Sequence, residues 1–280
     1  MKKKLLLHIC CAPDAAWIPE KLEQDYEVTC FFYNPNIYPA KEHEKRASEM
    51  RRLAKAKGYR LAEPPFDPEI FEKRTAHLRY QPEKAGRCSI CYRIRLEETA
   101  RFAHENGYDL FATVLTVSPH KLVDRINRIG ETVAEKYGIT YLPSDFKKED
   151  GFKKSVEESR NYNLYRQDYC GCESSLLYRQ LFKDAGSQAF VPLISCEKPG
   201  IYDVQSFRRW LDRKKLKTGF LFFQQTPTEA VLREAYEERI FLEPADNLDW
   251  RKRIFAKKKQ ETREINLSDV SNRDIFCDPL

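Results

Sequence analysis

The stretch "LLLHICCAPDA" (residues 5–15) runs from a short apolar segment into two adjacent cysteines, a proline and an aspartate. Because the apolar segment is brief and cysteines end it, it predicts a buried β-strand and not a signal peptide. Similar runs follow at 28–33 ("VTCFFY"), 110–117 ("LFATVLTV") and 189–194 ("AFVPLI"). The first cysteines are therefore expected at the end of a strand.

Helical patterns separate these runs. In "KLVDRINRIGETVAEKYG" (121–138) apolar residues share one face, and both this segment and 41–58 end on a glycine, where a helix would stop. The alternation predicts βαβ units, and hence an α/β fold with a parallel sheet that carries helices on both sides. Ligands of such sheets bind beyond the carboxyl ends of the strands, where Cys10 and Cys11 are expected.

Two regions are predicted. Residues 1–200 form an α/β catalytic domain that carries the cysteine site, and residues 201–280 form a helical, basic C-terminal region. The net charge is +6, and the basic runs 208–217 and 251–263 are either solvated helix faces or a surface that binds phosphate. No apolar stretch is long enough to span a bilayer, so we expect a cytoplasmic protein without a membrane partner.

Six of the nine cysteines form three close pairs, which are Cys10-Cys11, Cys88-x-x-Cys91 and Cys170-x-Cys172. Each pair lies in a loop-like setting, and all three are expected to meet at one end of the sheet. Sets of thiolates hold either structural zinc or an iron–sulfur cluster. The other three, Cys30, Cys196 and Cys277, are interpreted as structural or incidental. The sequence contains no G-x-x-x-x-G-K-[ST], G-x-G-x-x-G or G-x-S-x-G motif.

Four segments together resemble the epoxyqueuosine reductases of the QueH type: "HICCAP", "GRCSICYRIRLEETA", "TVLTVSPHK" and "YCGCESSL". The resemblance runs from about residue 4 to about residue 196. It implies a nucleotide α-hydrolase-like fold in which a cysteine loop replaces the phosphate loop. It also implies an iron–sulfur cluster and reductive removal of the epoxide oxygen from epoxyqueuosine at the wobble position of tRNA, giving queuosine. Many members carry a further cysteine where this chain has Asp14.

On this basis a [4Fe-4S] cluster is assigned to the first two cysteine pairs, because two pairs can wrap one cubane; the ligands are Cys10, Cys11, Cys88 and Cys91. Cys170 and Cys172 then form a second unit, which is either a redox-active disulfide or the site of a second metal such as iron. Asp14 is the candidate proton donor. Its alternative role is to cap a helix that starts near Ala15. The sequence does not identify the electron donor.

The tRNA is expected to place its modified base between aromatic side chains. As a helix, "SRNYNLYRQDYCGC" (159–172) would put four residues on roughly one face, either to hold this base or to pack on the core: Tyr162, Tyr165, Arg166 and Tyr169. His120 and Lys121 are expected to contact phosphate or ribose. The tRNA backbone is assigned to Arg253, Lys257, Lys258 and Lys259.

Two other functions remain open at this point. The same thiols would serve a cluster-dependent tRNA thiolation enzyme, although thiolation needs an activated base and the chain has no ATP-type phosphate loop. A zinc-stabilised RNA-binding module is the non-enzymatic alternative.

Overall fold

The computed structural model describes residues 2–79, 83–148, 150–177, 179, 204–213, 219–223 and 227–244. The chain divides into two compact units, one made of 1–77 and 83–173 and the other of 78–82 and 174–280. The predicted strand at 189–194 and the proposed boundary near residue 200 lie outside the described residues.

The first unit is built on five parallel strands in the order β3-β2-β1-β4-β5. Their bounds are β1 Lys3–His8, β2 Tyr26–Phe31, β3 Arg60–Ala62, β4 Leu110–Thr113 and β5 Thr140–Tyr141. The chain winds outward from β1 in one direction and then in the other, as in doubly wound nucleotide-binding sheets. The reversal places the carboxyl end of β1 at the topological switch point, between its neighbours β2 and β4.

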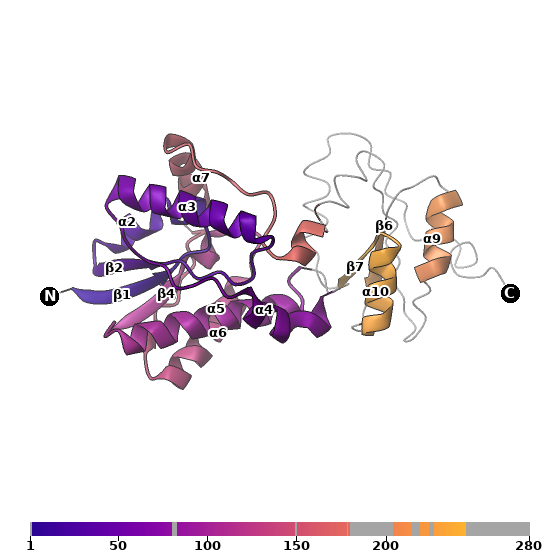
Figure 1. Ribbon diagram of the computed structural model, residues 1–280, viewed down its shortest axis with the longest axis horizontal. Helices are drawn as coiled ribbons and strands as arrows, with labels where there is room; N and C mark the ends of the chain where they lie inside the picture. The colour runs from indigo at the N-terminus through magenta and orange to yellow at the C-terminus, as the bar shows by residue number, and fades with distance from the viewer. Residues whose placement is uncertain are drawn as a thin grey trace. The chain divides into compact units, whose positions relative to one another are not determined.

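Helices cover both faces of this sheet, as predicted (Figure 1). On one side lie α2 (Ile18–Leu22), α3 (Ala40–Lys57) and α7 (Gly151–Asn161). Helix α1 (Ala12–Ala15) packs in the same core cluster as α3. On the other side lie α4 (Pro68–Thr75), α5 (Gly86–Glu105) and α6 (Val123–Tyr137).

The side chains of β1 alternate between two cores because successive residues of a strand face opposite sides. Leu5 and Leu7 belong to one buried cluster, which includes Met50 of α3. Leu6 belongs to the other, which includes Leu96 of α5. A sheet buried on both faces explains why the sequence of β1 is continuously apolar from Leu5 to Leu7.

The predicted helix ends are confirmed at two glycines. Gly58 follows α3 with φ 73°, and Gly138 follows α6 with φ 62°. This left-handed conformation, which glycine adopts without a Cβ penalty, ends each helix. The predicted strand 110–117 is shorter, because β4 ends at Thr113 and a 3-10 turn, η2 (Val114–Val117), follows. Thr113 Oγ1 accepts a bond from Leu115 N over 3.2 Å and so stabilises that turn.

The second unit contains the helices α9 (Val204–Arg213) and α10 (Glu229–Glu237). It also contains two parallel strands that the sequence analysis did not predict, β6 (Gly219–Phe223) and β7 (Ile240–Pro244). In neither unit does a described helix have the length and apolar character needed to cross a membrane.

Candidate metal and redox site

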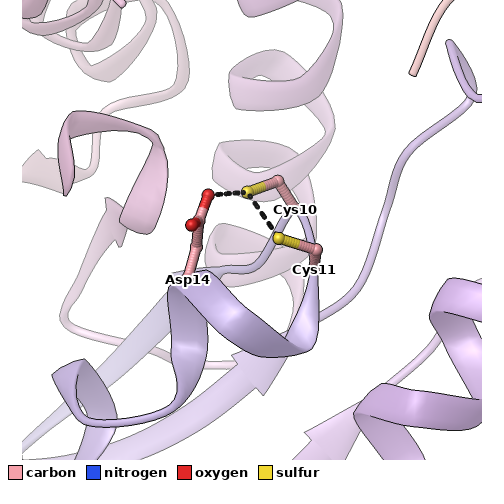
Figure 2. A group of neighbouring side chains, drawn as sticks. All are labelled: Cys10, Cys11 and Asp14. Atoms are coloured by element: carbon pink, nitrogen blue, oxygen red, sulfur yellow. Dashed lines mark hydrogen bonds between the residues drawn. The ribbon is translucent and has the colours of Figure 1, made fainter. Parts of the chain in front are cut away.

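Cys10 and Cys11 lie where the chain turns from β1 into α1. Cys11 is the N-cap residue of α1, with extended backbone, and Pro13 fits the first turn because that position needs no N–H donor. The sulfur atoms of Cys10 and Cys11 are 3.8 Å apart, and Cys10 donates to Asp14 Oδ2 over 3.0 Å. Figure 2 shows the two sulfurs and the carboxylate pointing toward one another. The two sulfur atoms and a carboxylate oxygen of Asp14 all lie within 4.8 Å of one another, close enough to share one metal ion.

The role of Asp14 as a helix cap is wrong. Asp14 lies inside α1, whose cap residue is Cys11, and the next helix, α2, is capped by Trp17. Its carboxylate instead accepts the bond from Cys10, and its side chain is half-buried. Asp14 therefore faces the thiols and remains open to a ligand.

Cys88 and Cys91 lie three residues apart on the first turns of α5, so both project from one face. The backbone N–H of Lys84 donates to Cys88 Sγ over 3.2 Å. Cys91 and Cys172 are buried members of one apolar cluster, against which Cys10 and Cys88 pack. The structure thus brings all three pairs together, as predicted.

The third pair lies in the segment after α7. Lys121 Nζ donates to Cys170 Sγ over 3.1 Å, and Gln167 Nε2 donates to Cys11 Sγ over 3.0 Å. The described cysteines form no disulfide with one another.

Burial keeps several of these thiols protonated in the absence of a cation. It raises the pKa of Cys88 to about 12 and that of Cys91 to about 11. The pKa of Cys10 is raised well above its ordinary value by the hydrogen bond with Cys11, by burial and by the negative charge of Asp14. Thiolates at these positions would therefore need positive charge nearby.

Two cationic side chains supply part of that charge. Arg95 is 3% exposed, and its Nη1 lies 4.0 Å from Cys91 Sγ. Burial lowers the pKa of Lys121, but the neighbouring Cys170 and Tyr92 raise it more, so the net pKa is well above the ordinary value and Lys121 stays charged.

His8 holds Arg95 in place. Arg95 donates from Nε to His8 Nε2 over 3.3 Å and from Nη2 to Asn34 Oδ1 over 2.6 Å. Burial and the charge of Arg95 lower the pKa of His8 well below its ordinary value, so the ring is neutral. Nδ1 of the ring lies 2.9 Å from Thr113 Oγ1, and Nε2 also lies 3.2 Å from Tyr33 O. His8 is a supporting residue that does not join the metal-binding group.

The predicted shared helix face of the tyrosines is wrong. Helix α7 ends at Asn161, because Asn163 adopts φ 47° and Leu164 N turns back to Ser159 O over 2.8 Å. Tyr165 instead donates to the Glu42 carboxylate over 3.2 Å.

The other members of this segment have separate contacts. Lys57 lies 5.0 Å from the ring centroid of Tyr162, and Tyr169 donates to Tyr38 O over 2.6 Å. Arg166 Nη1 donates to Ser159 Oγ over 3.2 Å.

The remaining predicted residues fall in three places. His120 is exposed on the turn before α6, whereas Lys121 reaches the cysteines. Cys30 is buried in β2, as expected of a structural cysteine. The rest lie outside the described residues: Cys196, Arg253, Lys257, Lys258, Lys259 and Cys277.

Three polar residues of the site were missed by the sequence analysis: Asn34, Arg95 and Gln167. Arg95 carried a signal, because it follows Cys91 by four residues on α5 and so shares its face. Gln167 carried none, since its contact with Cys11 depends on an irregular segment.

A doubly wound sheet whose switch point gathers the thiols of three cysteine pairs defines a thiol-rich α/β protein with a candidate metal and redox site. Residues 5–177 match the family model described as epoxyqueuosine reductase QueH. The epoxyqueuosine reductase QueH of Staphylococcus epidermidis is 37% identical over 203 residues, covering 68% of this chain and 84% of that protein.

Two further relatives carry the same name. The protein of Streptococcus pyogenes is 38% identical over 178 residues, covering 61% of this chain and 70% of its own. That of Thermotoga maritima is 36% identical over 179 residues, covering 63% of this chain and 92% of its own. The chain belongs to the epoxyqueuosine reductase QueH family, and it is an oxidoreductase.

Proposed function

We propose that this enzyme reduces epoxyqueuosine to queuosine at the wobble position of tRNA and depends on an iron–sulfur cluster. The observation that carries the proposal is the meeting of three cysteine pairs at the switch point of the sheet, in a chain of the QueH family. The reaction breaks both C–O bonds of the epoxide, forms a C=C bond, consumes two electrons and two protons, and releases water.

The residues present fit such a cluster. Soft thiolates are the ligands that iron–sulfur clusters use, and buried thiols with raised pKa values bind metal with release of their protons. Cys10, Cys11, Cys88 and Cys91 would hold the cluster. N–H donors aimed at Cys11 and Cys88 would stabilise the charged sulfurs. When bound, the cluster would supply electrons, and a second iron beside it would act as a Lewis acid on the epoxide oxygen.

Asp14 would supply a proton to the departing oxygen. Its carboxyl group lies 3.0 Å from Cys10 and is half-buried, so it is close to the thiols and partly accessible. Cys170 and Cys172 would act either as a redox-active dithiol or as ligands of the second metal. Lys121, charged and hydrogen-bonded to Cys170, would stabilise the thiolate in either role.

The tRNA would be held by residues of both regions. Tyr165 and Tyr169 are engaged by other groups through their hydroxyls, whereas Tyr38 is a large apolar side chain that leaves 44% of its surface exposed. Its backbone N–H donates to Gly171 O over 2.8 Å, between Cys170 and Cys172. We therefore add Tyr38 to the residues that would stack on the modified base.

Metal analysis and turnover test this function together. The protein purified without oxygen is expected to be brown, to contain iron and acid-labile sulfide, and to convert epoxyqueuosine in an anticodon stem-loop to queuosine with a chemical reductant. Colourless protein that contains zinc would favour an RNA-binding module. ATP consumption that depends on tRNA would favour thiolation.

A further inference from the structure

The segment that carries the third cysteine pair is irregular, but side chains of α3 hold it along its length. Most of these bonds go to backbone N–H and C=O groups, which in a strand would be satisfied by pairing with a neighbouring strand. Arg52 donates to Tyr162 O over 3.0 Å and to Asn163 O over 3.1 Å. Glu49 accepts from Tyr165 N over 2.9 Å.

Arg46 holds the end of this segment that reaches the cysteines. Its Nη1 donates to Cys170 O over 3.2 Å and its Nη2 to Tyr169 O over 3.4 Å, while Nε pairs with Glu42 over 2.8 Å. The Arg46 side chain is 2% exposed. A rigid guanidinium plane that bonds three acceptors at once leaves the backbone at Cys170 little freedom.

Gly171 fits closely against the same guanidinium. It adopts φ 135°, and a Cβ added there would lie 3.1 Å from Arg46 Nη1 and 3.2 Å from Asn36 Nδ2. A side chain at Gly171 would therefore have to displace Arg46 or Asn36 by a few tenths of an ångström, in a backbone conformation that favours glycine.

We propose that Arg46 is a positioning residue that fixes the Cys170–Cys172 segment against the other two cysteine pairs. Its effect on turnover rests on the proposed function. Its effect on the position and reactivity of Cys170 and Cys172 does not, because that depends only on the bonds described above.

The test compares Arg46→Gln with Arg52→Gln. The second variant removes similar bonds to the backbone of the same segment, at residues farther from the cysteines. Labelling of Cys170 and Cys172 by a maleimide under mild anaerobic reduction, followed by peptide mass analysis, is expected to be several-fold faster in Arg46→Gln. The labelling of Cys88 should not change. Turnover should fall by about 10²-fold, as for a reactive group displaced by about 1 Å, with an unchanged KM for the stem-loop. Arg52→Gln should match wild type in each measurement.

Wild-type labelling and wild-type kcat in a folded Arg46→Gln variant would overturn the proposal. If circular dichroism shows that Arg46→Gln does not fold, Arg46→Lys and Gly171→Ala replace it, because they disturb the same contact from its two sides. Each is expected to label faster at Cys170, and wild-type rates in both would equally overturn the proposal. If the wild-type protein does not reduce epoxyqueuosine but Arg46→Gln still labels faster than wild type, the proposed function is contradicted and the role of Arg46 stands.

Discussion

Gln167 donates a hydrogen bond from Nε2 to Cys11 Sγ over 3.0 Å, although 156 residues separate them in the chain. The bond ties the segment of the third cysteine pair to the first pair at the end of β1. An N–H donor to a ligand sulfur stabilises the reduced, more negative state of a cluster and so raises its potential.

Gln167→Leu is expected to lower the reduction potential of the proposed iron–sulfur cluster. If the bond is stronger by about 1 kcal/mol in the reduced state, its loss lowers the potential by about 40 mV for one electron. A potentiometric titration followed by visible absorbance measures the shift. Arg166→Leu, which loses a bond to Ser159 and leaves Cys11 untouched, is the control. An unchanged potential in Gln167→Leu would show that the bond to Cys11 does not influence the cluster.

Asp14→Asn is expected to reduce turnover by at least about 10²-fold, because general acids contribute about 10²–10⁴-fold. The amide keeps the size of the side chain but cannot release a proton as a carboxylic acid does. Cluster absorbance and the KM for the stem-loop should stay near wild type. Turnover close to that of wild type would exclude Asp14 as the proton donor.

Replacement of Cys170 or Cys172 by serine is expected to abolish turnover and to leave most of the cluster absorbance, because the cluster is assigned to the other two pairs. Iron and sulfide analysis beside single-turnover assays measures both effects. Cys30→Ser, in a buried cysteine of β2, controls for general destabilisation. Loss of the cluster in Cys170→Ser or Cys172→Ser would instead make that cysteine a cluster ligand.

Tyr38→Ala is expected to raise the KM for the stem-loop about fivefold to about 150-fold, since stacking of one base on an aromatic ring contributes about 1–3 kcal/mol. Tyr38→Phe keeps the ring and should bind like wild type. Because both variants keep the backbone bond to Gly171, kcat should change little. Equal KM values for Tyr38→Ala and wild type would remove Tyr38 from the base-binding residues.

Neutralising Arg253, Lys257 and Lys258 is expected to weaken binding of full-length tRNA and to flatten its salt dependence. Each lost phosphate contact removes about 0.7–0.9 from the slope of log K against log salt. Activity on a short stem-loop should change much less. Identical affinity and slope for wild type and variant would mean that these residues form a solvated face only.

The sequence was sufficient wherever a local rule governs the chain. Helical patterns and the closing glycines Gly58 and Gly138 predicted α3 and α6, and the loop-like settings of the cysteine pairs in a parallel α/β sheet predicted that they meet. It was insufficient where tertiary contacts override local propensity. The segment after Asn161 has helical spacing, but bonds from Arg46 and Arg52 hold it in an irregular path. Strands β6 and β7 stabilise each other by pairing, and the sequence of neither segment alone reveals that pairing.

The three cysteine pairs come from the beginning, the middle and the end of the first unit, and this order has a consequence for synthesis. A nascent chain that has emerged only as far as α7 carries two pairs and lacks Cys170, Gln167 and the bonds that they make. A metal bound at that stage would meet an incomplete set of partners. The four cysteines assigned to the proposed cluster would thus be available before the Cys170–Cys172 pair, which completes the site only when the rest of the first unit has emerged.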